Sequence, residues 1–383
     1  MWTNDEAFYD ILSMAAGNND SYALQSFIDE FKDQYNVLDA SGFAWAPMQA
    51  DFSFQQLEKE FGVNAMATYV DIDSPGTPIS FEGAKLSTGE IPRMKKLAQF
   101  NEKDYRQRLI AGAVGADPQL NAARSLLDAA KKLIDAHTNS LTYNRHQMVS
   151  SGKFQLTEAN NAGGIKGTLF TASIPNGNIV KKTSTAVWWD SNNDDGSTSD
   201  PIKDLKEIGA KAEERGSAFH WEVDKLTYKR TMAHAKVIQA IGYRMFPAAA
   251  SSAIATNIAN NAGADAQKAA LESIIGFPIK VIDSISRVDT YDKSKKAVVG
   301  TEVRSFEPNV WALVPDGKIG EILSVIPIYG GQGDAGAYGT YYGGRLLMTY
   351  EYETRKKVQY IETEMTALIV PDKPKHMYIL NVA

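Results

Sequence analysis

The run from Val63 to Leu109 combines two extended arms with a polar tip between them. Its first arm alternates side chains at a period of two, which is typical of a β-strand, and one face carries Met66, Thr68, Val70 and Ile72. The tip is rich in Pro, Gly, Ser and Thr, and the return arm, Ile91 to Tyr105, is charged throughout. Because an isolated hairpin is only marginally stable in water, the pattern predicts a long ribbon that lies on another surface. We expect that surface to belong to a second copy of the chain.

A long amphipathic helix is predicted from Asp117 to Val149. Asp117 can accept hydrogen bonds from the free N–H groups of the first turn, and Pro118 suits the first helical position, where no N–H is needed. No Gly interrupts the run to Ser151. One stripe recurs every three or four residues and comprises Leu120, Ala123, Leu127, Ala130, Ile134, His137 and Leu141. At about 30 residues the helix would be roughly 45 Å long, and we expect it to pack on a sheet rather than in a coiled coil.

The other elements mix helices and strands without strict alternation, which favours an α+β fold. Short helices are expected near residues 8–14 and 24–31, and longer ones at 200–216, 224–241 and 265–275, each of these three opened by an Asp and followed by a Gly. Strands are expected at 153–156, 167–172, 219–223, 279–282, 310–314, 346–352, 358–370 and 377–382. A loop rich in Gly and Tyr is expected at 329–344.

The amino-acid composition excludes several classes of function. The chain has 383 residues, of which 44% are hydrophobic, and this is enough to bury a sizeable core. Cys is absent, which excludes disulfides, thiolate zinc sites and a Cys nucleophile. The net charge is −6 and no basic stripe stands out, so any contact with nucleic acid is expected to be non-specific. We expect no membrane span and no signal peptide, because there is no run of 18 apolar residues and the first residues are acidic.

Motifs that would indicate an enzyme are weak. Residues 331–336 form a literal GxGxxG, but the AYGTYYGG that follows does not favour the helix that a dinucleotide site requires. Residues 190–196 are similar to a calcium loop, but the glycine falls one place late and Pro201 occupies the position of the bidentate Glu. A flexible loop and a solvated polar loop are the favoured interpretations. There is no nucleophile elbow and no phosphate-binding P-loop.

The histidines and one carboxylate pair are the remaining candidates for catalytic or metal-binding groups. The five histidines lack the HExxH spacing of zinc proteases, and His137, on the helix stripe, is expected to be a hydrogen-bonded core or boundary residue. Glu362 and Glu364 share one strand face and could act as an acid/base pair, although the solvated face of a strand is the favoured interpretation. We therefore expect no catalytic, cofactor or metal site.

The charged return arm is the strongest functional signal. Its mixed charges favour self-complementary docking over nucleic-acid binding, although a solvated surface hairpin is the simpler alternative. The candidate contacts between subunits are Lys85, Glu90, Arg93, Lys95, Lys96, Glu102, Lys103, Asp104 and Arg106.

The order of these elements resembles the major capsid proteins of tailed bacteriophages, which have the Hong Kong 97-type capsid fold. Three runs carry the resemblance: STGEIPRMKKLAQFNEKDYR at 87–106, PNVWALVPDGKIGEI at 308–322 and TALIVPDKPKHMYILNV at 366–382. The first is similar to the descending arm of the family's extended loop, the second to a late axial-domain strand and turn, and the third to the closing peripheral strands.

The resemblance implies an α+β fold divided into five parts. These are an N-terminal arm at 1–62, an extended loop or β-hairpin at 63–109, a peripheral domain at 110–200 that includes a spine helix at 117–149, an axial domain at 201–344, and a return to the peripheral domain at 345–383. The Gly/Tyr-rich loop at 329–344 would lie at the symmetry axis.

The resemblance also implies a function. It implies a major capsid protein, not an enzyme, that assembles as hexamers and pentamers into an icosahedral shell around double-stranded DNA, held without sequence specificity. A portal is expected, as is a separate scaffolding protein, because no charged scaffold segment precedes the arm; a decoration protein is an open partner. Assembly would take place in the host bacterial cytoplasm, and the chain would reside in the virion capsid.

Two alternatives and one modification stay open. Bacterial encapsulin shells, which enclose cargo enzymes, share the fold, and a soluble nucleotide-binding enzyme using residues 331–336 is the alternative from another class. Some relatives crosslink subunits by a Lys–Asn isopeptide bond. Lys85, near the loop tip, is the lysine placed for this chemistry, but the sequence identifies neither its Asn partner nor an activating Glu.

Overall fold

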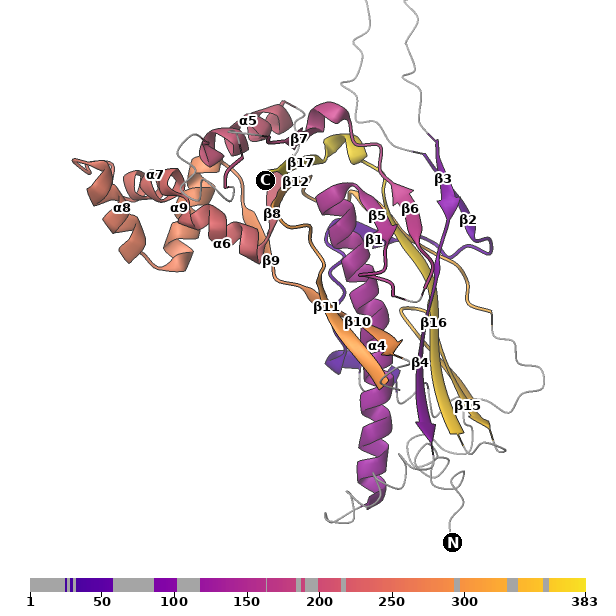
Figure 1. Cartoon of the computed structure of the whole chain (residues 1–383). Coiled ribbons are helices and arrows are strands. Elements are labelled where there is room, and N and C mark those ends of the chain that lie inside the picture. Colours follow the sequence, from indigo (N-terminus) through magenta and orange to yellow (C-terminus); the bar gives the residue numbers. More distant parts are fainter. Residues whose placement is uncertain are drawn as a thin grey trace, which may run out of the picture.

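A computed structural model of the chain gives two hydrophobic cores, the first of which is built on one long helix. It describes residues 25, 28–29, 32–57, 86–101, 118–162, 164–183, 187–189, 199–214, 218–292, 297–328, 337–353 and 358–383. Figure 1 shows an elongated sheet running beside the helix, with a second, helix-rich unit set to one side of the helix's C-terminal end.

The long helix is α4, Pro118–Ser151, which at 34 residues is about 51 Å long. The predicted helix is confirmed, and it extends two residues further than expected. It ends at Gly152, whose φ of +70° lies in the left-handed region that glycine adopts without strain. Ile134, Leu141 and Met148 are fully buried on one side of α4, which packs on the sheet rather than on another helix.

The first sheet has six strands and covers α4. Its members are β1 (Phe43–Trp45), β4 (Arg93–Asn101), β13 (Gly320–Ser324), β14 (Ala337–Tyr341), β15 (Leu346–Glu353) and β16 (Val358–Pro371). The long strand β16 pairs antiparallel with β4, β13 and β15, and β1 adds in parallel to β13. This sheet and the buried side of α4 enclose the first core.

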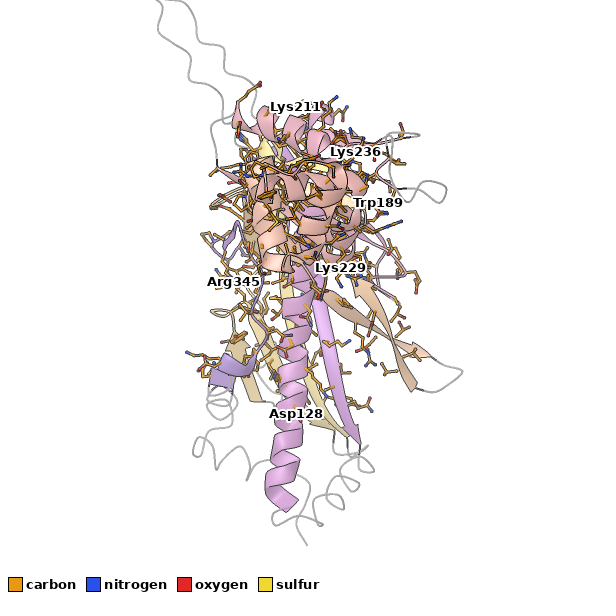
Figure 2. The ribbon with its side chains drawn as sticks, turned by 90° about the vertical axis from the view of Figure 1, so that its left-hand side faces the viewer. Asp128, Trp189, Lys211, Lys229, Lys236 and Arg345 are labelled. Carbon is orange, nitrogen blue, oxygen red and sulfur yellow. The ribbon has the colours of Figure 1, made fainter. Side chains whose placement is uncertain are left out.

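The second sheet has five strands in the order β7 (Ile179–Lys181), β17 (Tyr378–Asn381), β12 (Val310–Pro315), β8 (Phe219–Asp224) and β9 (Ile279–Ile282). Five helices belong to this unit: α5 (Pro201–Glu213), α6 (Lys225–Ala233), α7 (Ala235–Met245), α8 (Ser252–Asn261) and α9 (Ala264–Ile275). Figure 2, which looks onto these helices, shows Lys211 and Lys236 on them and Asp128 far along α4.

Strand β12 lies between the two cores. Val310, Ala312 and Val314 belong to the first core, whereas Trp311 and Leu313 belong to the second. Because successive strand residues point to opposite faces, a strand covered on both faces must be continuously apolar. This explains the run VWALV.

Short ribbons and single turns complete the structure. The ribbons pair β2 (Ser53–Leu57) with β3 (Leu86–Glu90), β5 (Lys153–Leu156) with β6 (Gly167–Thr171), and β10 (Ile285–Asp292) with β11 (Ala297–Arg304). The 3₁₀ turns are η1 (Lys32–Gln34), η2 (Asn176–Asn178) and η4 (Pro374–His376). Of the two N-terminal helices expected, residues 8–14 lie outside the described residues, and residues 25, 28 and 29 are helical.

The prediction that the return arm, Ile91 to Tyr105, lies on another copy is wrong for residues 93–101, and residues 102–105 lie outside the described residues. The described base of that ribbon is β2 with β3, and the chain leaves it at Ile91, which is 2% exposed and donates its N–H to Phe52 O at 2.8 Å. The run that follows, β4, pairs along its length with β16 of the same chain rather than depending on another copy. Met94 and Ala98 explain this outcome, since they pack against the first core while their neighbours stay exposed.

Four further expectations are corrected. The closing strands do not share a sheet, because β16 lies in the first sheet and β17 in the second. Residues 337–341, expected in a loop of the axial domain, form β14 in the first sheet. The helix expected at 224–241 is broken at His234, whose ψ of 130° is extended, and it then continues to Met245. Asp265 does not cap α9, because the N-cap is Gly263.

Candidate assembly interface

A face of exposed charge follows β4 and β16. Lys95 lies directly opposite Glu364 in the register of these strands, and Arg93 is diagonal to it. The Lys95 ammonium lies 2.9 Å from a Glu362 oxygen and 3.0 Å from a Glu364 oxygen, and Arg93 Nε lies 3.2 Å from Glu364 Oε1. The structure therefore brings two predicted contact residues, Arg93 and Lys95, onto the Glu362/Glu364 pair.

These ion pairs argue against an acid/base role for Glu362 and Glu364. The hydrogen bonds of Lys95 to Glu362 and Glu364 raise its pKa, so it is a fixed cation at neutral pH. Both carboxylates are held by this cation, and the geometry is that of surface ion pairs. With side chains 49% and 46% exposed, Arg93 and Lys95 form pairs of the kind that contribute about 0–1 kcal/mol. A neighbouring molecule could therefore re-pair these charges at little cost.

Lys96 lies on the opposite face of β4. Its ammonium is 3.2 Å from Asp289 Oδ2 on β10, which ties the β10–β11 ribbon to the sheet. Glu90, at the end of β3, is exposed. Lys85, Glu102, Lys103, Asp104 and Arg106 lie outside the described residues, as do the GxGxxG at 331–336 and the polar loop at 190–196.

His137 lies on α4 beneath the same strands, as the stripe predicts. Its Nε2 is 3.0 Å from Thr363 Oγ1 on β16, and the side chain is buried. Burial disfavours the charged ring and the nearby Lys96 charge adds to this effect, so the pKa of His137 falls from 6.5 to about 4. The ring is neutral at pH 7, and it makes this helix–sheet contact sensitive to acid.

Acidification from pH 7 to pH 5 is expected to cost about 2 kcal/mol of stability through His137. The unfolded chain takes up a proton near the ordinary pKa of 6.5, whereas the folded chain does so only near 4, so stability falls as the pH drops between these values. Urea denaturation of the parent and of His137→Asn at both pH values measures the effect. The variant should lose about 2 kcal/mol less on acidification, and an equal loss in both proteins would contradict the assignment.

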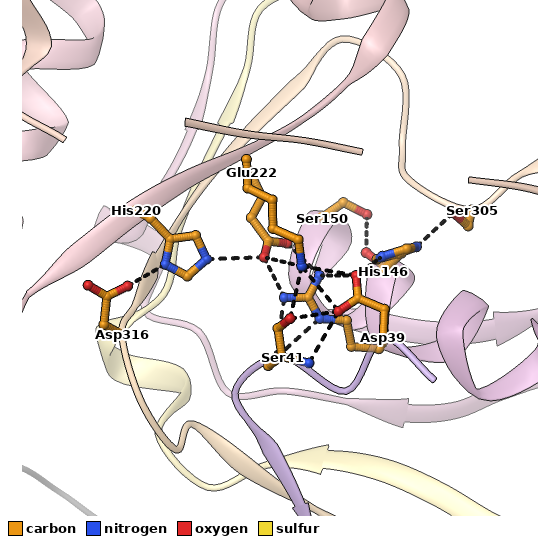
Figure 3. Close-up of polar contacts among 10 residues, drawn as sticks. Asp39, Ser41, His146, Ser150, His220, Glu222, Ser305 and Asp316 are labelled. Carbon is orange, nitrogen blue, oxygen red and sulfur yellow. Dashed lines mark hydrogen bonds and ion pairs between the residues drawn. The ribbon is translucent and has the colours of Figure 1, made fainter. Parts of the chain in front are cut away.

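A second polar cluster joins the two cores (Figure 3). Arg145 of α4 and Glu222 of β8 are fully buried, and both terminal guanidinium nitrogens of Arg145 donate to the carboxylate, Nη1 at 2.6 Å. Burial opposes the ionisation of Glu222, but the Arg145 charge and the bond from His220 outweigh it and hold the Glu222 pKa below its ordinary value. This two-point pairing fixes α4 against the second sheet.

The N-terminal segment is fastened to the same cluster. Asp39 accepts from Lys280 Nζ at 2.9 Å and lies 3.2 Å from His146 Nε2, and Arg145 donates to the carbonyl of Ser41. Burial of Asp39 opposes its ionisation, yet the bond to His146 and the Arg145 charge hold its pKa well below the usual range. The N-terminal segment, α4 and β8 are distant in sequence, and they meet at the guanidinium of Arg145.

His220 closes the outer side of the cluster. Its two ring nitrogens lie 2.6 Å from Asp316 Oδ1 and 3.1 Å from Glu222 Oε1. Burial lowers the pKa of the ring, but the bonds to both carboxylates outweigh it and raise the pKa. This cluster was not predicted from the sequence. The one available signal was a basic residue, Arg145, four residues beyond Leu141 on the buried stripe of α4.

Within the part of the chain that the structure describes, no three His, Asp or Glu side chains gather as metal ligands would. The described helices include none with the length and apolar character needed to cross a bilayer. The structure thus has an exposed face of paired charges on β4 and β16, and a buried polar cluster around Arg145 that joins the two cores.

The chain matches one protein family and is similar to several solved structures. A family model described as phage major capsid protein E matches residues 20–382. No individual curated protein matches the chain. Similar solved structures include a prophage capsid protein of Escherichia coli CFT073 (13% identity, 100% of both chains, TM-score 0.47) and the capsid of cyanophage P-SCSP1u (11% identity, 91% of this chain and 89% of that one, TM-score 0.46). An encapsulin of Synechococcus elongatus PCC 7942 is also similar (10% identity, 89% and 85%, TM-score 0.37).

Proposed function

The chain belongs to the phage major capsid protein E family, and from this premise we propose that it assembles as hexamers and pentamers into a closed icosahedral shell around double-stranded DNA. The observation that carries the proposal is the family match over residues 20–382. Family membership makes the chain a shell-forming protein of the phage virion, with the α+β, Hong Kong 97-type capsid fold. Copies of the chain are therefore its principal partners.

In this proposal the two units, each built on one sheet, are two different domains of the capsid subunit. The first sheet with α4 is the peripheral domain, and the second sheet with α5–α9 is the axial domain. The ribbon based on β2 and β3 is the extended loop, which reaches a neighbouring copy. The buried Arg145–Glu222 pair supports this division because it holds the two units in one orientation, as a closed shell of repeated contacts requires.

Other partners follow from the same role. A portal and a separate scaffolding protein act during assembly in the host bacterial cytoplasm, and a decoration protein is a possible addition. The net charge of −6 suits an inner wall on which packed DNA slides, because binding strength rises with the number of phosphates neutralised. The chain needs no catalytic site or cofactor for this role.

Electron microscopy of the chain, expressed alone and with its neighbouring genes, tests the proposal. We expect closed shells or tiles of hexamers and pentamers, with DNA inside when packaging partners are present. Shells that contain a cargo protein instead of DNA would favour the encapsulin alternative. A monomer or dimer in every condition, with a thermal shift on adding nucleotide, would favour the soluble enzyme.

Reversing the charges of Arg93, Lys95 and Lys96 to Glu is expected to reduce shell yield at least tenfold while leaving the subunit folded. Each lost in-chain pair costs about 0–1 kcal/mol, and the new carboxylates facing Glu362, Glu364 and Asp289 add repulsion, so the thermal midpoint should fall while the subunit stays folded. Shell yield by sedimentation and the thermal midpoint of the free subunit measure the two effects.

A charge swap supplies the control. Arg93→Glu and Lys95→Glu combined with Glu362→Lys and Glu364→Lys restores opposite charges within the chain but changes the face shown to a neighbour. If this face contacts another copy, the swap should not recover assembly. Full yield from the triple reversal would refute the contact role.

A further inference from the structure

One stretch of the chain carries cations without any acidic residue. Between Asp224 and Asp265 the sequence has five basic residues and no Asp or Glu, although the net charge of the whole chain is −6. The five are Lys225, Lys229, Arg230, Lys236 and Arg244. The stretch forms α6, α7 and α8. This part of the helix-rich unit therefore holds a local positive charge that the net charge conceals.

Helix α6 presents two of these cations on its exposed side. Thr227 and Thr231 are 2% and 0% exposed, and they fix one side of the helix in the fold. At 3.6 residues per turn, Lys229 falls on the side opposite these two threonines and Arg230 falls next to it. Both cations are accordingly exposed. They reach solvent from an ordered element.

The first turn of α7 adds a third cation. The Lys236 ammonium donates to the carbonyl of Ser199 at 2.5 Å, and the Arg230 guanidinium lies 5.0 Å from the centre of the Trp189 ring. Figure 2 shows Lys229, Lys236 and Trp189 toward the same side of the helix-rich unit. We call Lys229, Arg230 and Lys236 the basic face.

The two remaining cations of the stretch are engaged elsewhere within the chain. Lys225 forms an ion pair with Asp283, which offsets its charge. Arg244, at the end of α7, donates to Ser273 Oγ of α9 at 3.0 Å. Neither is therefore counted in the basic face.

The chemistry of the basic face suits a polyanion better than a protein partner. The centres of protein–protein interfaces are enriched in aromatic residues and Met and depleted in Lys. The exposed side of α6 instead carries Lys229 and Arg230 with one large apolar side chain, Leu226, and a single exposed apolar residue is ordinary. Lys and Arg bind nucleic acid largely through its phosphates, whatever the base sequence.

We propose that the basic face contacts the phosphates of the double-stranded DNA inside the shell. This inference rests on the proposed function, which supplies the DNA, and it names the side chains of the subunit that touch it. If three phosphates are neutralised, the logarithm of the affinity falls against the logarithm of the salt concentration with a slope of about −2.7. Such a contact is weak in one subunit, so the DNA can move along it, and repetition over many copies makes it effective.

Binding of a short labelled DNA duplex to the free subunit, titrated at several salt concentrations, tests the contact. Neutralising the basic face should weaken binding about tenfold or more and remove most of the salt dependence; this variant is Lys229→Gln with Arg230→Gln and Lys236→Gln. The matched control changes the net charge equally at three exposed lysines elsewhere, Lys153→Gln with Lys181→Gln and Lys318→Gln. The control should bind nearly as the parent does, and thermal midpoints confirm that both variants fold. No measurable binding by the parent, or equal losses in the two variants, would overturn the inference.

Competition with poly-glutamate distinguishes DNA from an acidic protein partner. The duplex carries the higher density of charge, so poly-glutamate should displace it only at a higher concentration of charges. Displacement at a lower concentration would assign the basic face to an acidic polypeptide and overturn the assignment to DNA.

Reductive methylation of lysines gives a second readout inside the shell. Lys229 should react several-fold more slowly in shells filled with DNA than in empty shells, and equal rates would overturn the inference. Shells that never form, or that never hold DNA, would count against the proposed function, and the duplex titration still tests the basic face in that case. Filled shells in which Lys229 stays fully reactive refute the DNA contact alone.

Discussion

Replacing Arg145 by Met is expected to lower the free energy of unfolding by about 3–5 kcal/mol. The guanidinium is fully buried and is paired with the fully buried carboxylate of Glu222, so its removal leaves that carboxylate without its main counter-charge. The carbonyl of Ser41 loses its donor at the same time. The loss should therefore loosen the joint between the two cores as well as destabilise the fold.

Urea denaturation of the free subunit at pH 7 measures this loss. The control is Lys280→Met, which removes a cation from the half-exposed edge of the same cluster and should cost about 1 kcal/mol or less. The double variant Arg145→Met with Glu222→Gln should regain part of the stability, because it removes the uncompensated charge. A loss below 1 kcal/mol in Arg145→Met would mean that the pair does not hold the joint.

Replacing Trp311 by Ala is expected to cost about 3–5 kcal/mol. The indole is fully buried on β12 and contacts the rings of Trp188, Trp221 and Tyr228, with centroid separations of 6.3, 5.9 and 6.5 Å. Its Nε1 donates to Thr231 Oγ1 at 3.3 Å. Truncation would leave a cavity at the centre of the second core and remove the indole donor from Thr231 Oγ1, which keeps its own hydrogen bond to the Thr227 carbonyl.

Thermal and urea unfolding of Trp311→Ala measure the effect, with Trp311→Phe as the matched control. Phe keeps a ring against the neighbouring indoles and should lose less than half as much stability. Near-ultraviolet circular dichroism should change in Trp311→Ala more than far-ultraviolet dichroism does, because ring packing is lost before helices are. An unchanged unfolding midpoint in Trp311→Ala would contradict the central place of this side chain in the second core.

The positions of the candidate contact residues in the fold were predictable in part. A charged strand of mixed sign was visible in the sequence, and the structure places Arg93, Lys95 and Lys96 on a paired strand with two of the three on an exposed face. Their partners were not predictable, because Glu362 and Glu364 lie more than 260 residues away along the chain. Alternation indicates which side chains share a face but not which strand lies alongside.

Local chemistry in the sequence was sufficient for the elements whose signals lie within a few residues. The cap of Asp117 and Pro118, the absence of Gly and the stripe through Leu141 predicted α4 almost to its last residue. The apolar runs of β12 and β16 likewise predicted buried strands. The tertiary structure decided the rest. β4 pairs with β16 instead of continuing the ribbon, and β17 lies in the second sheet rather than in the sheet of β16. Arg145 of α4 pairs with Glu222 of the second sheet. These outcomes depend on long-range pairing and on the high cost of an unpaired buried charge, and neither leaves a periodic trace in a single sequence.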